Sequence, residues 1–259
     1  MRRRFSPALL LAASLLATGA TTARADTVKV LTSGAFKQIV LALVPGFEAR
    51  TGHTVVVSND TAGALAKRIA EGEPFDLVVL TPAALKALAV DGPRGKVVAD
   101  TVKPLASVGI GVAVKTGAAR PDISSVDQFR QALLNARKVA YIDPAAGGSS
   151  GIYLEGLFRQ MGIADAVHAK AVLVKGGYVA EKLVTGEADL AVHQISEILP
   201  VTGAELVGPI PESVQNYTTY AGAVGRDSEH PEAAQAFLDS LSGEAAAAVL
   251  QQKGMLPAR

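Results

Sequence analysis

The sequence predicts an α/β protein of two lobes, each a mostly parallel sheet flanked by helices, with a cleft between the lobes. Two observations support this fold class. Short apolar runs alternate with segments whose apolar residues recur at helical spacing, which is the pattern of α/β layering. In addition, residues 107–114 fit a strand that crosses between lobes, and residues 217–224 fit a returning strand. The predicted boundaries place lobe one at 26–106 plus 223–259 and lobe two at 107–222.

The first 25 residues have the features of a secretory signal peptide. A basic start at 2–4 precedes an apolar run at 8–17 and an A-x-A site at 23–25. We therefore predict cleavage after Ala25 and a periplasmic location. The apolar run is too short to span a bilayer, and no later run approaches ~20 apolar residues, so stable membrane insertion is not expected after cleavage.

Composition narrows the classes of partner. Four of the 25 basic residues lie in the predicted signal peptide, so the mature chain would carry 21 basic and 24 acidic residues, a formal net charge of −3. Such a chain shows no electrostatic footprint for nucleic acid. The sequence has no cysteine, and its 4 histidines form no pair at ligand spacing, so we predict neither a metal site nor a cofactor. We expect a monomer that binds a small anion.

In lobe one, three apolar runs predict strands, and a predicted helix follows each of them. The strands are expected at 27–31, 54–58 and 75–80, and the helices at 36–47, 64–70 and 83–88. Thr81 and Pro82 predict the start of the third helix, because proline is favoured at the first helical position. Pro45 predicts a kink or an early end of the first helix.

Lobe two shows the same alternation. Strands are expected at 139–142, 172–174 and 190–192, and helices from residues 125, 154 and 179. Pro231 predicts the start of the final helices, which return the chain to lobe one.

Three predicted strand-to-helix junctions combine small hydroxyl residues with glycine: Thr32-Ser33-Gly34, Thr61-Ala62-Gly63 and Ser149-Ser150-Gly151. In α/β sheets, ligands bind at the carboxyl ends of strands. Helix amino ends carry unpaired N–H groups and partial positive charge. Three such ends around one cleft predict a small-anion site. The alternative is that these residues simply cap their helices.

Further candidates lie near these junctions. Gly147, Gly148 and Gly151 lack the Cβ atoms that would keep an anion away. Arg68 could hold a carboxylate with its guanidinium fork, or it could be a solvated surface residue. His193 ends a buried strand, where side chains face a cleft, although a lone histidine is more often a structural residue.

The loop at 147–151 does not match the G-x-S-x-G pattern of a serine hydrolase. Fingerprints for a phosphate loop or a dinucleotide are also missing from the sequence. These classes are therefore excluded.

The junctions resemble the periplasmic molybdate-binding protein family, which belongs to the type 2 periplasmic binding proteins of ABC transporters. The resemblance rests on Thr32-Ser33-Gly34, on the segment 61–79 and on Thr185-Gly186-Glu187-Ala188-Asp189, and it extends over nearly the whole mature chain. It implies two α/β lobes joined by two strands, with an oxyanion held between them by hydroxyls and backbone N–H groups. By this resemblance, the groups that hold the oxyanion would be Ser33, Thr61, the loop around Ser150 and the Gly177–Tyr178 loop.

Some residues depart from the molybdate pattern. Gln194 stands where molybdate binders usually carry Tyr, and Thr61-Ala62 stands where they carry a Ser pair. A different set of residues resembles a side branch that includes periplasmic aconitate isomerase: Arg68, Gln194 with Ile195-Ser196-Glu197, and the segments 150–154 and 217–223. The combined candidate ligand-binding residues are Ser33, Gly34, Thr61, Ala62, Arg68, Ser149, Ser150, Gly151, Tyr153, Gly177, Tyr178, His193 and Gln194.

Three functions follow as hypotheses. The favoured one is a non-enzymatic periplasmic binding protein that captures an organic carboxylate between its lobes and delivers it to an ABC permease. The second is an aconitate isomerase, in which His193 and Tyr153 would transfer the proton. The third is a true molybdate or tungstate carrier.

Overall fold

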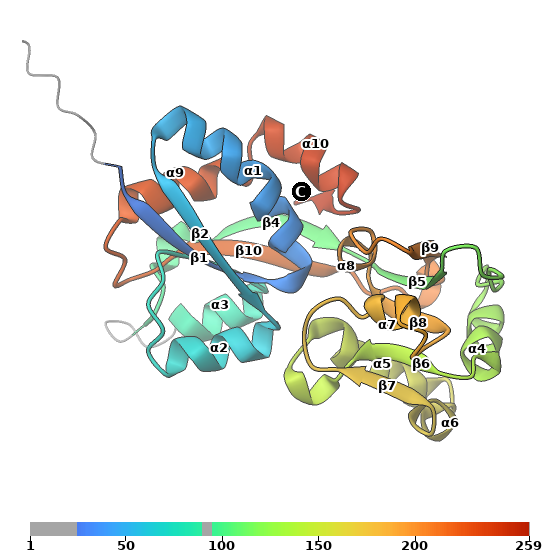
Figure 1. The fold of residues 1–259 in the computed structure, drawn as a ribbon. Helices are drawn as coiled ribbons and strands as arrows, with labels where there is room; N and C mark the ends of the chain where they lie inside the picture. The colour runs from blue at the N-terminus through green and yellow to red at the C-terminus, as the bar shows by residue number, and fades with distance from the viewer. Residues whose placement is uncertain (1–24, 90–94, 259) are drawn as a thin grey trace, which may run out of the picture.

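The computed structural model describes residues 25–89 and 95–258, which form two lobes, each with its own β-sheet (Figure 1). The predicted signal peptide, except for its last residue, lies outside these residues. Within the described ranges, no helix is long and apolar enough to cross a membrane.

The first lobe is built on a 6-stranded sheet with the order β11-β4-β10-β3-β1-β2. Its strands are β1 (Thr27–Ser33), β2 (Thr54–Asp60), β3 (Leu77–Leu80), β4 (Lys103–Val108), β10 (Thr218–Val224) and β11 (Leu256–Pro257). Its helices are α1 (Gly34–Thr51), α2 (Ala62–Ala70), α3 (Pro82–Ala89), α9 (Pro231–Ser240) and α10 (Glu244–Gln252), with a 3-10 turn η2 (Ala99–Thr101).

Helices cover both faces of this sheet, and β3 shows why its sequence is apolar throughout. Successive side chains of a strand point to opposite faces. Leu77 and Val79 therefore pack in the core under α1 and α9, whereas Val78 and Leu80 pack in the core under α2 and α3. In Figure 1 these two pairs of helices lie on opposite sides of the sheet.

The second lobe has a 5-stranded sheet with the order β7-β6-β8-β5-β9. Its strands are β5 (Ile110–Lys115), β6 (Val139–Ile142), β7 (Ala171–Val174), β8 (Leu190–Gln194) and β9 (Ala204–Pro209). Its helices are α4 (Val126–Asn135), α5 (Ser149–Gln160), α6 (Ala164–His168), α7 (Glu181–Val184) and α8 (Ile195–Ile198), with turns η3 (Pro144–Ala146) and η4 (Glu212–Val214). Tyr141 and Phe158 pack edge to face in its core, with ring centroids 5.4 Å apart.

The two-lobed α/β fold is confirmed, and both sheets are mixed. β1 pairs in parallel with β2 and β3, and β6 pairs in parallel with β7 and β8. Antiparallel pairs arise where the connecting strands enter, because β10 runs against β3 and β5 runs against β8. Sequence patterns alone did not indicate these strand directions.

The chain changes sheets at Gly109, between β4 and β5, so the predicted crossing strand is two strands. A Cβ at Gly109 would lie 3.2 Å from side-chain atoms of Gln215 and Tyr217, which belong to the returning segment. The predicted lobe boundaries at 106/107 and 222/223 fall within β4 and β10, both of which belong wholly to the first sheet.

Two proline predictions have different outcomes. α3 begins at Pro82, and Ala84 N–H donates to Thr81 Oγ1 (3.4 Å), as the sequence predicts. α1 instead continues through Pro45 to Thr51, and Gly52 ends it in a left-handed conformation (φ 76°).

Candidate functional site

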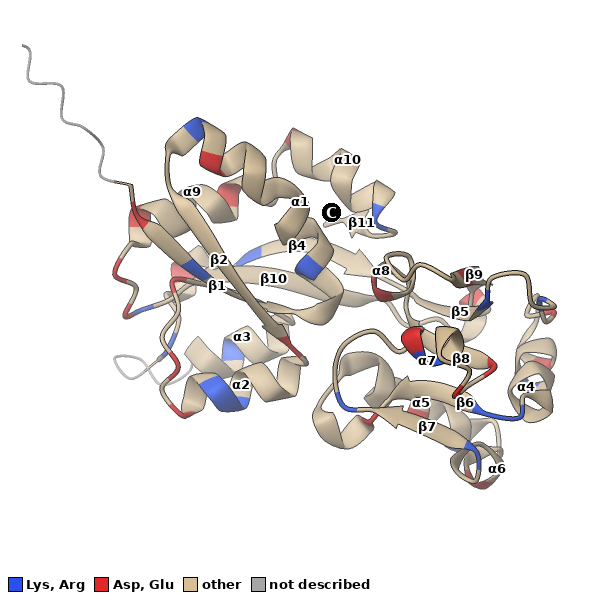
Figure 2. Cartoon of the chain, in the orientation of Figure 1, with Lys and Arg blue, Asp and Glu red and all other residues tan. Residues whose placement is uncertain are grey.

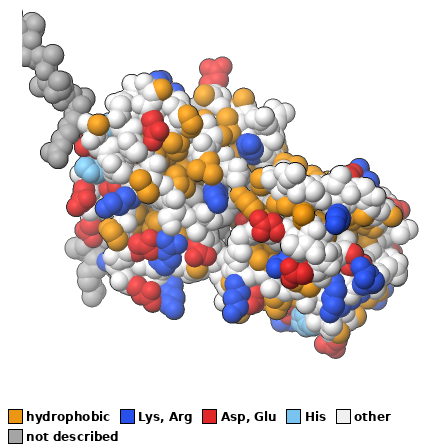
Figure 3. All heavy atoms as spheres, in the orientation of Figure 1, with side chains coloured by type: hydrophobic (Ala, Val, Ile, Leu, Met, Phe, Trp, Pro, Cys, Tyr) orange, Lys and Arg blue, Asp and Glu red, His pale blue; other side chains and the backbone are white. Residues whose placement is uncertain are grey.

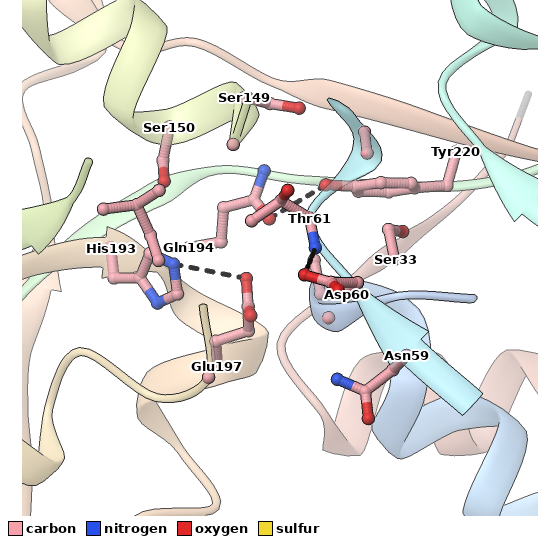
Figure 4. A pocket seen from close by; sticks show the side chains of 16 residues that line it. Ser33, Asn59, Asp60, Thr61, Ser149, Ser150, His193, Gln194, Glu197 and Tyr220 are labelled. Carbon is pink, nitrogen blue, oxygen red and sulfur yellow. Dashed lines mark hydrogen bonds and ion pairs between the residues drawn. The ribbon is translucent and has the colours of Figure 1, made fainter. Parts of the chain in front are cut away.

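A pocket of about 30 Å³ lies between the two lobes. On a scale where one water occupies ~10–15 Å³, this leaves room for the oxygens of one carboxylate or oxyanion. Figure 4 shows side chains from both lobes pointing into it. Its lining residues are Ser33, Gly34, Ala35, Asn59, Asp60, Thr61, Ala62, Ile142, Gly148, Ser149, Ser150, Gly177, His193, Gln194, Glu197 and Tyr220.

The start of α1 forms one wall of the pocket. Ser33 is the N-cap residue, but its side chain makes no capping hydrogen bond. Its Oγ is buried and has no hydrogen-bond partner among the described residues. A buried hydroxyl without a partner is costly, since its hydrogen bonds to water are lost and not replaced. The Ser33 hydroxyl is therefore free to bind a ligand.

The start of α2 forms a second wall and touches the opposite lobe. Thr61 Oγ1 caps α2 by accepting a hydrogen bond from Ala64 N–H (3.1 Å), and it also donates to the carbonyl of Ala146. Gly63 N–H donates to Gly147 O across the cleft (3.1 Å). Thr61 thus serves as a cap and as a contact between the lobes, and Asp60 Oδ1 accepts a hydrogen bond from its N–H (2.8 Å).

The start of α5 forms the third wall, with Ser149 at its first position and Ser150 buried beside it. The glycines at this helix start are required for packing more than for ligand access. A Cβ at Gly148 would lie 2.4 Å from Ile142 Cγ2, and one at Gly151 would lie 2.2 Å from Ile142 O. Close packing of α5 on β6 therefore explains both glycines.

Gly151→Ala is expected to destabilise the protein by about 1–3 kcal/mol, because the added methyl group would overlap a backbone carbonyl that cannot rotate away. Urea denaturation would measure the change. Gly156→Ala is the matched control on the same helix, since a Cβ there has no heavy atom within 4 Å; it should stabilise α5 by roughly 0.5–1 kcal/mol. Equal stabilities for the two variants would contradict the packing explanation.

The base of the pocket is formed by the end of β8 and the short helix α8. His193, Gln194 and Glu197 are all buried there. Gln194 Oε1 accepts a hydrogen bond from the hydroxyl of Tyr220 (2.9 Å), which ties β8 to β10 of the other lobe. Gln194 Nε2 has no partner among the described residues. An amide donor is therefore directed toward the pocket without being satisfied by the protein.

His193 and Glu197 form a close pair, with 3.4 Å between Nε2 and Oε2. Burial lowers the pKa of His193 to about 3. Burial also raises the pKa of Glu197 to about 8, against a smaller opposing effect of Lys37. Both directions have the same cause, because a charge loses its hydration in a buried site. At neutral pH the imidazole and the carboxyl are therefore both uncharged.

The lobes also touch beside the pocket. Gln38 of α1 donates to the hydroxyl of Tyr178 (2.5 Å), and Lys37 Nζ lies 5.7 Å from the centroid of the same ring. A Cβ built on Gly147 would lie 2.7 Å from the Cα of Gly63. Figure 3 shows the two lobes in contact. The structure therefore describes the lobes in contact around the pocket.

Most of the predicted ligand-binding residues line this pocket: Ser33, Gly34, Thr61, Ala62, Ser149, Ser150, Gly177, His193 and Gln194. Arg68, Gly151, Tyr153 and Tyr178 do not line it. Arg68 is paired with Glu73 and Asp60 and donates to Ser58 Oγ. Tyr153 donates its hydroxyl to the carbonyl of Val214 (2.7 Å).

Sequence reasoning missed Asn59, Asp60, Glu197 and Tyr220, which also line the pocket. Glu197 follows His193 at i+4, and that spacing after a buried strand was an available signal. Tyr220 belongs to the segment 217–223 that carries the side-branch resemblance, but its place at the pocket depends on how β10 pairs. Within the described residues, no group of His, Cys, Asp and Glu could hold a metal ion. Charged residues are scattered over both lobes (Figure 2).

Two lobes with separate mixed sheets and a polar pocket at their junction form the fold of type 2 periplasmic binding proteins. The family model described as bacterial extracellular solute-binding protein matches residues 28–256, and the chain belongs to this family. The family resemblance predicted from the sequence is thereby confirmed.

Individual proteins are similar to this chain in sequence or in fold. The chain is 36% identical over 259 residues to an aconitate isomerase from a Pseudomonas species, covering 97% of this chain and 96% of that protein. It is similar in fold to the periplasmic molybdate-binding protein of Azotobacter vinelandii, with a TM-score of 0.75, 19% identity, and coverage of 90% of this chain and 100% of that one. The sulfate-binding protein of Mycobacterium tuberculosis gives a TM-score of 0.70 at 19% identity, covering 90% and 87%.

Proposed function

We propose that this protein binds a small organic anion, a carboxylate, in the pocket between its lobes. The observation that carries the proposal is the convergence of the starts of α1, α2 and α5 on the pocket, with Ser33 Oγ and Gln194 Nε2 buried beside them as unpartnered donor groups. Helix amino ends and buried donors together favour a negative charge without a matching cation. An anion would satisfy both donors, which the described protein groups do not.

A carboxylate is favoured over molybdate by the sequence relative and not by the charge of the lining. Asp60 and Glu197 both border the pocket, and carboxylates and molybdate are both ionised near neutral pH. The aconitate isomerase relative points to the same ligand class. A tricarboxylate would exceed the present cavity, so its entry requires the lobes to separate.

We further propose a periplasmic location and delivery of the ligand to an ABC-type permease. The family membership supports an extracellular solute-binding role. Arg68, Tyr153 and Tyr178 are not proposed to touch a small anion in the contact arrangement of the lobes, since each has other partners there. They remain candidates only for a larger ligand.

Ser33→Ala is expected to weaken anion binding by about 10- to 150-fold, the effect of losing one hydrogen bond to a charged group, about 1.5–3 kcal/mol. Stability should not fall, because the Ser33 hydroxyl has no partner among the described residues and its burial is already costly. Isothermal titration with citrate, trans-aconitate, malate and molybdate would measure the affinities, and thermal unfolding would measure the stability.

Ser125→Ala is the matched control for Ser33→Ala. Ser125 caps α4 by accepting a hydrogen bond from Gln128 N–H (3.2 Å). Its replacement should cost about 1 kcal/mol of stability and leave affinity unchanged. Binding of none of these anions by the wild-type protein would contradict the proposed function, and binding of molybdate alone would favour the molybdate carrier.

A second candidate function is isomerisation of aconitate, and the uncharged His193–Glu197 pair favours it. The reaction moves a double bond: a C–H bond of the methylene group breaks, its electron pair shifts into the carboxylate-stabilised allylic system, and a new C–H bond forms at the former vinyl carbon. Neutral His193 can accept the first proton and protonated Glu197 can supply the second. Transfer from Nε2 to Oε2 across 3.4 Å then restores the pair.

Conversion distinguishes this candidate from a carrier. Wild-type protein incubated with trans-aconitate would be followed by NMR for the appearance of cis-aconitate. Catalytic conversion would establish an isomerase. Binding with no conversion would leave the carrier function as the conclusion.

A further inference from the structure

Glu197 is a carboxyl group placed inside a pocket proposed for an anion. It sits on α8 directly after β8, and its side chain is 9% exposed. It reaches across the cleft to the start of α1, where a Cβ on Gly34 would lie 2.4 Å from its Oε1. A side chain at residue 34 would therefore force the carboxyl of Glu197 to move. The fold thus brings an acidic group of one lobe against the anion-binding helix end of the other.

The groups around Glu197 do not neutralise a negative charge there. His193 faces it from β8 and is uncharged, because burial holds the pKa of that imidazole low. Lys37 of α1 attracts it, but no ion pair within 4.0 Å joins the two in the described structure. Tyr178 and Tyr220 also face this space, and Asp60 at the end of β2 adds a second carboxyl to the lining.

An ionised Glu197 would repel a bound anion in a buried pocket where water screens little. A protonated Glu197 would instead donate a hydrogen bond to it. We propose that the pocket binds its anion together with one proton, which Glu197 carries. This inference rests on the proposed anion-binding function and specifies the charge state in which the site works.

The sign of the pH dependence follows from linkage. Anion binding favours protonated Glu197. Below the pKa of Glu197 the free protein already holds this proton, and the affinity for the anion is at its maximum. Above that pKa the proton must be taken up on binding, and the affinity falls. With the pKa of Glu197 raised to about 8, the loss begins near that pH. Above it, the affinity should fall by up to about tenfold for each pH unit.

Isothermal titration with trans-aconitate would test the proposal from about pH 7 to about pH 9.5, where this ligand stays fully ionised. Wild-type affinity should be flat at the lower end and decline above about pH 8. Glu197→Gln should bind with little pH dependence, because the amide keeps the shape and a donor without ionising. Repeating wild-type titrations near pH 9 in buffers of different ionisation enthalpy should show uptake of about one proton per anion.

Glu155→Gln is the matched control. Glu155 is a largely buried carboxyl of the same lobe, paired with Arg159 and His168, and it does not line the pocket. This variant should keep the wild-type pH profile. A wild-type affinity independent of pH, or no proton uptake near pH 9, would overturn the proposal while leaving anion binding intact. The buffer experiment needs no variant, so it tests proton uptake even if Glu197→Gln fails to fold.

A failure of the proposed anion-binding function would give a different result from a failure of the proton-uptake proposal. If neither trans-aconitate nor molybdate binds to the wild-type protein at any pH, the anion site itself is wrong and this proposal falls with it.

Discussion

Gly63→Leu is expected to weaken ligand binding by at least about 100-fold while leaving the protein folded. Gly63 of α2 and Gly147 of the other lobe approach so closely that a Cβ on Gly63 would lie 2.8 Å from the Cα of Gly147. The obstructing atom is backbone, so no side-chain rotation can relieve the overlap. Overpacking of this kind typically costs 1–3 kcal/mol for a few added methylenes, and a full leucine exceeds that. The lobes can avoid the cost by staying apart, which removes half of the site from the ligand.

The folded state of each lobe should tolerate this change. Leucine is a far better helix former than glycine, so α2 itself is not weakened. Gly156→Leu provides the control, because Gly156 lies on α5 with no heavy atom near its Cβ position. Titration with trans-aconitate would measure the affinities, and small-angle X-ray scattering would report whether the lobes close on the ligand. A Gly63→Leu protein that binds like the wild type would show that the lobes need not meet at this point.

The fold class could be predicted because most strands and helices have a recognisable local sequence pattern. The four residues of β3 are all apolar since both faces of that strand are covered, and α3 begins at Pro82 since proline suits the first helical turn. The direction of strands could not be predicted in the same way. β10 enters the first sheet from the opposite lobe and runs against its neighbours, and that arrangement depends on pairing between residues more than one hundred positions apart.

The walls of the site could also be predicted, because ligands in α/β sheets settle where strands end and helices begin. Ser33, Thr61 and Ser150 stand at such junctions and line the pocket. The role of Arg68 depends on side-chain partners that the pattern did not reveal. Its guanidinium is engaged by Glu73, which follows the turn after α2, and by Asp60, which precedes that helix. Arg68 thus supports the carboxyl that accepts the Thr61 N–H.

The glycines at the start of α5 illustrate a different limit. Their lack of Cβ atoms suggested access for an anion, yet the atoms nearest to Gly148 and Gly151 belong to Ile142 of β6. A glycine required for helix-on-strand packing and one required for ligand access have the same sequence signature. Only the position of the neighbouring strand distinguishes them.

His193→Asn is expected to lower the turnover of trans-aconitate by about 10²- to 10⁴-fold if the protein is an isomerase, which is the range that general acid–base groups contribute. His193 lines the pocket, is uncharged at neutral pH and stands 3.4 Å from its proton partner Glu197. Asparagine keeps an uncharged polar group in the buried position but cannot accept the proton from carbon. The affinity for trans-aconitate should therefore change much less than turnover, a split that a merely structural histidine would not produce.

His168→Asn is the control, since His168 is a surface residue that pairs with Glu155 outside the pocket. NMR of the trans-to-cis conversion would give turnover, and titration would give affinity for each variant. Turnover should also decline as pH rises beyond the pKa of Glu197, about 8, because the donor that protonates the product carbon is then lost. An active His193→Asn protein would show that this histidine is not needed for the reaction. Glu197 would then be the group of the pair that both accepts and donates the proton.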